Sequence, residues 1–148
     1  MPNDSKDSKN EALFDTSILV YAYDKSEPVK REICSKLVEE VFNKERAGYI
    51  SNQILAELYF VLTEKKGLTK EEAKTIVSNF IESNSWMKVD YDTETVKQAM
   101  NSSKTIDVIF WDILIAETMK ENGIDIIYTE NENDFKKIPG IKVINPIK

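Results

Sequence analysis

The 148-residue chain contains no histidine. Histidine is the most frequent general base of enzymes and a frequent metal ligand, so its absence excludes Ser-His-Asp triads, zinc sites of the histidine type and paired-histidine nuclease chemistry. A hydrolase without histidine still has one well-established route to an activated water, which is a metal ion held by carboxylates. The acidic side chains of this chain therefore decide what chemistry is open to it.

The chain has one cysteine, Cys34, and no long apolar run. A single cysteine excludes an internal disulfide and a thiolate zinc cluster, and its helical surroundings predict a small buried side chain. No run reaches the roughly 18 apolar residues of a membrane span. The first ten residues, M-P-N-D-S-K-D-S-K-N, lack the apolar core of a signal peptide. We therefore expect a disordered tail over residues 1–10, no membrane partner and a cytoplasmic location.

The length of the chain indicates how many domains it forms, and its net charge indicates which partners it can attract. The remaining residues, 11–148, have the usual size of one domain, and neither an internal repeat nor a linker divides them. The formal net charge is -6, so no global basic field is available to attract nucleic acid or a membrane surface. Any contact with RNA or DNA must therefore be local.

Strand and helix patterns alternate along the chain, which predicts an α/β fold. The expected strands cover residues 11–14, 49–50, 86–89, 124–128 and 142–144. The first expected helix starts near residue 16 or 17. The others cover residues 28–45, 52–66, 70–82, 93–102, a segment within 106–123, and 134–137. Thr69 and Glu72 fit a capping box, and Ser51 or Asn52 caps the helix before it.

Three apolar stretches each contain a single charged residue. Asp15 lies in residues 12–23, Glu57 in residues 51–63, and Asp112 in residues 108–116. Burying an isolated carboxylate costs several kcal/mol, by rough estimate, so each needs a partner, a proton or a metal ion. If the three meet, one divalent cation neutralises them together, and their hard oxygen ligands select Mg²⁺ or Mn²⁺.

Each of these carboxylates also has a purely structural interpretation. Any one of them can cap a helix or pair with a buried lysine. Asp15 is placed where it can cap the helix that follows the first strand, and this role is compatible with metal binding. The structural interpretation weakens when all three residues are taken together, because the cost of burial multiplies.

Four segments, taken in order, resemble the PIN domain, and within it the toxin ribonucleases called VapC. They are F-D-T-S-I-L-V-Y-A-Y-D at 14–24, Q-I-L-A-E-L at 53–58, F-W-D-I-L-I-A-E at 110–117 and Y-T-E-N-E-N-D-F at 128–135. The segment P-G-I-K-V-I-N-P at 139–146 is similar to the ending of bacterial and archaeal members. The resemblance covers nearly the whole chain from residue 12.

This resemblance implies a three-layer α/β/α fold with a central, mainly parallel sheet. It also implies a ribonuclease that uses Mg²⁺ or Mn²⁺ to cleave RNA, and the toxin half of a type II toxin-antitoxin system. The implied partners are a second copy of the chain in a homodimer and a small antitoxin that inserts a side chain into the acidic site. The alternative is a non-toxin PIN module that processes or binds RNA with weak or no catalysis.

Residue by residue, Asp15, Glu57 and Asp112 match the first three acids of the family and are the expected catalytic and metal-binding residues. Thr16 or Ser17 matches the small polar position beside the first acid, and Thr129 matches the threonine before the fourth. Where many members have a fourth acid, this chain has Asn131, which offers a carbonyl oxygen but no charge. Asp134 is the candidate to take its place.

Three further features have two interpretations each. Phe110 and Trp111 can stack an RNA base, although such aromatic residues more often belong to a core or a dimer interface. The lysines Lys65, Lys66 and Lys70 can bind phosphates, although such a run more often forms a solvated helical face. Asp15 at a strand end also fits a phosphohydrolase nucleophile, but that chemistry usually requires a second acid two residues later, where this chain has Ser17.

Overall fold

The computed structural model describes residues 11–148, so the predicted disordered tail at 1–10 lies outside the described residues. The domain is built on a five-stranded sheet in which every pair of neighbouring strands is parallel, in the order β3-β2-β1-β4-β5. The strands are β1 (Ala12–Phe14), β2 (Gly48–Ser51), β3 (Trp86–Val89), β4 (Ile126–Tyr128) and β5 (Lys142–Ile144). The expected parallel α/β fold is confirmed.

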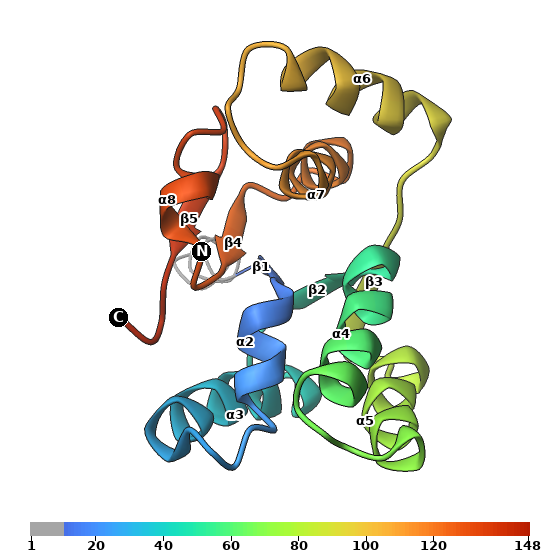
Figure 1. Cartoon of the computed structure of the whole chain (residues 1–148), viewed down its shortest axis with the longest axis vertical. Helices are drawn as coiled ribbons and strands as arrows, with labels where there is room; N and C mark the ends of the chain where they lie inside the picture. Colours follow the sequence, from blue (N-terminus) through green and yellow to red (C-terminus); the bar gives the residue numbers. More distant parts are fainter. Residues whose placement is uncertain (1–10) are drawn as a thin grey trace.

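Helices cover both faces of this sheet (Figure 1). One group consists of α2 (Thr16–Tyr21), α3 (Pro28–Phe42), α4 (Asn52–Glu64) and α5 (Lys70–Glu82). The other consists of α6 (Thr93–Ser103), α7 (Phe110–Glu121) and the short α8 (Glu132–Phe135). Between residues 11 and 148, no helix is both long enough and apolar enough to cross a membrane.

The central strands are short and buried along their whole length. All three residues of β1 and all three of β4 are buried, as expected for parallel strands covered by helices on both faces. The ring of Phe14 meets those of Trp86 and Tyr128 edge to face, with ring centroids 4.9 Å apart in both pairs. Because side chains on both faces of β1 pack into the core, the position of the residue that follows the strand, Asp15, is fixed by the core.

Most helix starts lie where the sequence predicts them. The Ser51 hydroxyl accepts a hydrogen bond from the backbone N–H of Ile54, so Ser51 rather than Asn52 caps α4. The capping box of Thr69 and Glu72 is present at the start of α5. These caps fix where α4 begins, and therefore where its acidic residue lies relative to the sheet.

Several predicted boundaries are wrong, including the end of α4, which lies at Glu64 rather than at residue 66. Helix α3 ends at Phe42 rather than at residue 45, because Lys44 adopts a positive φ of 62°. Strand β4 begins at Ile126 rather than at residue 124, because the N–H of Ile124 bonds the Met119 carbonyl and completes the cap of α7. Helix α8 covers 132–135 rather than 134–137, which buries Phe135 completely.

The chain changes direction across the sheet at β1. It first moves from β1 to β2 and β3, and then returns to the other side of β1 to form β4 and β5. The two sets of crossover helices therefore lie on opposite faces, and their connections diverge at the carboxyl ends of β1 and β4. Ligands of open α/β sheets bind at such a point. Asp15 follows β1 directly, and Thr129 follows β4 directly.

Candidate metal centre

Asp15 joins the first strand to two other parts of the site. Its Oδ1 accepts a hydrogen bond from the backbone N–H of Thr16 at 2.9 Å, so it caps helix α2 as the sequence suggested. Its Oδ2 accepts a hydrogen bond from the Thr129 hydroxyl at 2.7 Å. The carboxylate is therefore held between the two neighbouring strand ends, β1 and β4.

Glu57 approaches the same point from the middle of α4. Its side chain is partly buried, and its Oε1 accepts a hydrogen bond from the Thr16 hydroxyl at 3.0 Å. Thr16 thus contacts two acids, Asp15 through its backbone N–H and Glu57 through its hydroxyl. The small polar residue after Asp15 links the first and second acids.

Asp112 lies in the first turn of α7 and is reached by the side chain of Asn131. The Asn131 amide nitrogen donates to Asp112 Oδ2 at 3.0 Å and to Asp134 Oδ2 at 3.1 Å. The backbone N–H of Asn131 donates to the Thr129 hydroxyl at 3.0 Å. The Asn131 amide therefore bridges Asp112 and Asp134, and brings Asp134 to the other acids.

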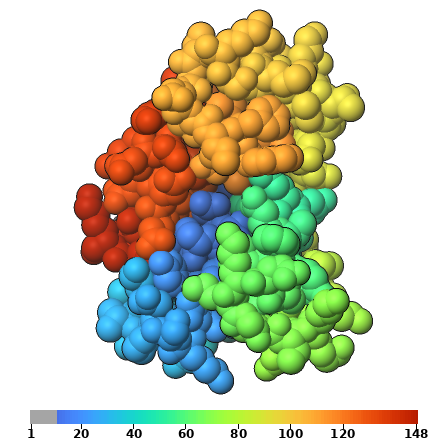
Figure 2. All heavy atoms as spheres, in the orientation of Figure 1, coloured from blue at the N-terminus to red at the C-terminus, as the bar shows by residue number. Residues whose placement is uncertain are grey.

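These contacts bring four carboxylates from separate segments to one edge of the sheet. They are Asp15, Glu57, Asp112 and Asp134, and we refer to them as the acidic cluster. Figure 2 shows the start of the described chain, in blue, surrounded on one face of the molecule by the segments of α4, α7 and residues 129–135. The side chains of Asp15, Glu57 and Asp112 lie on one face of the molecule. They are linked through Thr16, Thr129 and Asn131.

Burial and mutual repulsion raise the pKa of three of these carboxyl groups. Burial is the main cause for Asp15 and Glu57, and the charge of Asp15 raises the pKa of Glu57 further. For Asp112, burial and then the charges of Asp15, Asp134 and Glu57 raise the pKa to about 7. Hydrogen bonds from Thr129, Thr16 and Asn131 oppose these shifts without cancelling them. The cluster is thus destabilised when all its members are ionised.

This repulsion predicts how the stability of the metal-free protein depends on pH. Asp112 stays protonated in the folded protein up to about pH 7, whereas it ionises near its ordinary pKa of 3.8 when unfolded. The folded state therefore binds more protons between pH 4 and 7, and the free energy of unfolding falls as pH rises through this window. After allowance for partial exposure, we expect Asp112→Asn to stabilise the protein at pH 8 by about 2 kcal/mol.

Urea unfolding in the presence of a chelator, at pH 5 and pH 8, measures this effect. The exposed Asp107 provides the matched control, because Asp107→Asn removes the same charge from a carboxylate outside the cluster. Equal stability changes for the two variants at pH 8 would contradict the predicted repulsion.

The donor set fits a hard divalent cation. It offers four carboxylates, whose oxygen atoms are donors of the type that Mg²⁺ and Mn²⁺ prefer. Within residues 11–148, no lysine or arginine forms an ion pair with any member of the acidic cluster. In that same part of the chain, no three acidic side chains lie close enough together to hold an ion as they stand. Direct coordination by three of them requires their side chains to turn toward one another.

A surface hollow of about 480 Å³ adjoins Glu57. Its lining includes Gln53, Tyr91 and Trp111, a residue that is 53% exposed. Phe110, in contrast, packs against the hydrophobic core. The two aromatic residues that the sequence singled out therefore differ, since only Trp111 presents its ring to solvent beside the acidic cluster.

The predicted RNA-binding lysines lie away from the cluster. Lys65 and Lys66 follow the last turn of α4, roughly 12 Å along the helix axis from Glu57. Lys66 pairs with Asp24 at 2.9 Å, and Lys70 begins α5. These lysines are not placed to touch a group held by the acidic cluster, although they remain available to a longer ligand.

Glu130 is a residue that sequence reasoning did not assign to the site. The Ser17 hydroxyl accepts a hydrogen bond from the Glu130 N–H at 3.2 Å, so Ser17 contacts the 129–131 segment while Thr16 contacts Glu57. The Glu130 carboxylate accepts hydrogen bonds from the Tyr21 hydroxyl. The sequence offered one signal for this residue, which is its position between two members of the site.

Fold and site together define a parallel α/β domain with carboxylates gathered at the switch point of its sheet. The model of the PIN domain family matches residues 12–141, so the chain belongs to the PIN domain family. No curated protein sequence matches the chain significantly.

Solved structures with the same fold include VapC toxins. VapC20 of Mycobacterium tuberculosis, a sarcin-ricin loop cleaving toxin, is 15% identical with a TM-score of 0.67, over 84% of this chain and 93% of that one. The DNA-bound VapBC complex of Salmonella typhimurium contains a chain that is 24% identical with a TM-score of 0.64, over 90% of this chain and 96% of that one. The promoter-bound VapBC2 complex of Rickettsia felis contains a chain that is 22% identical with a TM-score of 0.63, over 91% of this chain and 98% of that one.

Proposed function

We propose that this protein is a metal-dependent endoribonuclease that uses Mg²⁺ or Mn²⁺ to cleave RNA phosphodiester bonds. The observation that carries the proposal is the acidic cluster, whose carboxylates meet without a basic partner within residues 11–148. Membership of the PIN domain family supports the same chemistry. A chain without histidine has few other ways to activate water.

Asp15, Glu57 and Asp112 would hold the ion, with Asp134 and the carbonyl of Asn131 as further oxygen donors. A bound divalent ion lowers the pKa of a coordinated water and stabilises charge on the phosphate. The residues of the chain supply the orientation. Thr129 positions Asp15, Thr16 positions Glu57, and Asn131 positions Asp112 through direct hydrogen bonds. Such contacts around metal ligands typically fix their geometry.

The RNA would approach across the hollow beside Glu57. An unpaired base can stack on the exposed ring of Trp111, which places the neighbouring phosphate near the acidic cluster. The net charge of -6 makes long-range attraction of RNA weak, so local contacts and the ion itself must supply affinity. Lys65, Lys66 and Lys70 would contact only more distant phosphates.

Within this proposal, the protein acts as the toxin of a type II toxin-antitoxin pair in the cytoplasm. Several structurally similar chains come from complexes described as VapBC or as toxin-antitoxin complexes, including one from Klebsiella pneumoniae. The expected partners are a second copy of the chain and a small antitoxin whose side chain enters the acidic cluster. A PIN module that processes or binds RNA outside such a pair is the alternative.

Removing the metal should abolish cleavage. We expect the purified protein to cut a mixture of single-stranded RNA oligonucleotides with Mn²⁺ or Mg²⁺, to lose this activity in EDTA, and to regain it when excess Mn²⁺ is added. Gel analysis of labelled RNA measures the fragments. Cleavage that persists in EDTA would contradict the proposal, and so would hydrolysis of a generic phosphate monoester in place of RNA.

Asn131 supports a second candidate function, which is RNA binding without cleavage. An amide contributes no charge where a fourth carboxylate would, and it occupies a hydrogen-bonded position between Asp112 and Asp134. A protein that binds RNA in the presence of Mn²⁺ in a gel-shift assay, but leaves it intact, would favour this function over the nuclease.

A further inference from the structure

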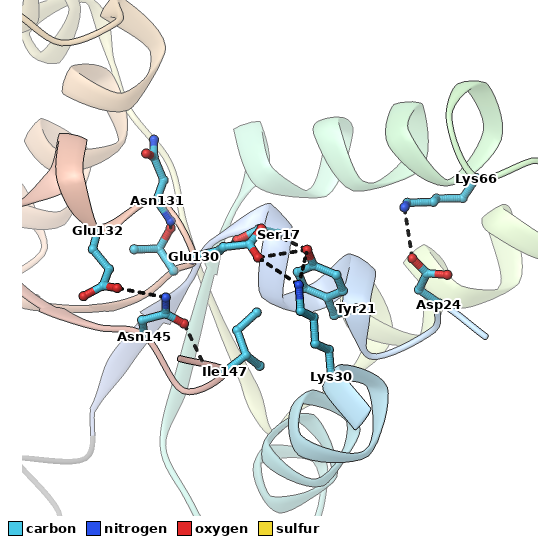
Figure 3. Close-up of polar contacts among 11 residues, drawn as sticks. Ser17, Tyr21, Asp24, Lys30, Lys66, Glu130, Asn131, Glu132, Asn145 and Ile147 are labelled. Carbon is cyan, nitrogen blue, oxygen red and sulfur yellow. Dashed lines mark hydrogen bonds and ion pairs between the residues drawn. The ribbon is translucent and has the colours of Figure 1, made fainter. Parts of the chain in front are cut away.

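The side chain of Glu130 is turned away from the acidic cluster. The Tyr21 hydroxyl lies 3.0 and 2.9 Å from its two carboxylate oxygens, and Lys30 Nζ lies 3.5 Å from Oε2. Figure 3 shows Tyr21, Lys30 and Glu130 joined in this way, with the side chain of Asn131 directed elsewhere. Tyr21 is the last residue of α2, and Lys30 lies in the first turn of α3.

The backbone of Glu130 is fixed to the same helix. Its N–H donates to the Ser17 hydroxyl at 3.2 Å, so both its main chain and its side chain are tied to α2. Glu130 is the middle residue of the three that connect β4 to α8. Its neighbours on either side are Thr129, which contacts Asp15, and Asn131, which contacts Asp112.

We propose that Tyr21, Lys30 and Glu130 form a clasp that positions Thr129 and Asn131, and through them the metal-binding carboxylates. This inference rests on the proposed function, because it assigns the clasp to the same ion site. The clasp residues touch neither the ion nor the substrate. They are positioning residues, which act by holding the connection between β4 and α8 against α2 and α3.

Because its residues are exposed, the clasp contributes more to the orientation of the segment after β4 than to the stability of the fold. The side chains of Lys30 and Glu130 are 35% and 42% exposed, and ion pairs this accessible contribute little to folding. Their geometric effect is larger, because the segment they hold is only three residues long and carries contacts to three of the four acids. Loss of the hydrogen bonds that Thr129 and Asn131 make to the metal-binding carboxylates would typically weaken metal binding about 10- to 100-fold, and the clasp acts through these two residues.

Calorimetric titration of Mn²⁺ into the metal-free chain tests the clasp through three substitutions. Tyr21→Phe removes one hydroxyl and no charge, and we expect it to weaken Mn²⁺ binding about 10-fold. Glu130→Ala should weaken binding at least as much. Glu130→Gln keeps an acceptor for the Tyr21 hydroxyl, so it should bind Mn²⁺ more tightly than Glu130→Ala.

Glu132→Ala is the matched control for charge. Glu132 lies two residues from Glu130, but it contacts Lys136, Lys148 and Asn145 and none of the clasp residues. We expect this variant to bind Mn²⁺ as the wild type does. Thermal unfolding in EDTA separates positioning from folding, because the clasp variants should unfold within a few degrees of the wild type.

The outcomes distinguish a failure of the clasp from a failure of the proposed function. Unchanged Mn²⁺ affinity in Tyr21→Phe, or equal weakening in Glu130→Ala and Glu132→Ala, would overturn the clasp and leave the metal site intact. Weakened binding accompanied by a large loss of thermal stability in Tyr21→Phe would also overturn it, as a general structural effect. A wild type that binds no Mn²⁺ would contradict the proposed function itself.

Discussion

Asp15→Asn is expected to lower the rate of metal-dependent RNA cleavage by about 10³-fold, equivalent to about 4 kcal/mol of transition-state stabilisation. The carboxylate lies at the end of the central strand, between Thr16 and Thr129, and is the acid whose position the core fixes most tightly. Asparagine has nearly the same shape, and its carbonyl oxygen accepts one of these hydrogen bonds. The variant therefore removes the charge that we propose holds the ion, while leaving the strand and helix in place.

Quantified cleavage of labelled RNA, with thermal unfolding of each sample, measures this effect. Asp125→Asn is the control, since Asp125 is exposed and precedes β4 at the opposite end from the site. This control should retain full activity. An Asp15→Asn protein that is folded and cleaves RNA at the wild-type rate would remove Asp15 from the catalytic machinery.

Asn131→Asp is expected to destabilise the metal-free protein and to increase its stabilisation by Mn²⁺. The amide donates to Asp112 and Asp134, so an aspartate there exchanges two charge-assisted hydrogen bonds for repulsion between carboxylates. We expect the free energy of unfolding in EDTA to fall by about 2 kcal/mol. Bound Mn²⁺ reverses this loss, because a ligand at 100 times its dissociation constant stabilises the folded state by about 2.7 kcal/mol.

Thermal unfolding with and without Mn²⁺ shows both parts of this prediction. Asn133→Asp is the matched control, because it adds the same charge two residues away at an exposed position. It should leave both melting temperatures near those of the wild type. A variant Asn131→Asp that is as stable as the wild type in EDTA would show that the amide does not bridge the two aspartates.

The sequence singled out three acids that the structure places near one another, and their role as metal ligands stays a prediction. Asp15, Glu57 and Asp112 each interrupt an apolar stretch, and burial is indeed the main cause of the raised pKa of each. The expectation that they meet rested on the cost of burying isolated carboxylates, and the strand-end position of Asp15 indicated the edge of the sheet where they would do so. Capping rules likewise predicted the starts of α4 and α5.

The side-chain contacts that hold the site together could not be predicted from sequence patterns. Whether Glu130 faces solvent or Tyr21 depends on how α2 lies against the connection after β4, and residues 21 and 130 are far apart in the sequence. The bridging amide of Asn131 depends similarly on the approach of α7. Local rules describe caps and periodicity, but they do not fix the rotamers of polar side chains that meet only in the folded state.

Direct measurement of Mn²⁺ binding to the metal-free wild-type protein tests whether the acidic cluster is a cation site. Isothermal calorimetry is expected to show saturable binding of at least one ion per chain, and Asp112→Asn should weaken it strongly. Heats no larger than those of dilution for the folded wild-type chain, with no rise in its melting temperature on adding Mn²⁺, would contradict the account.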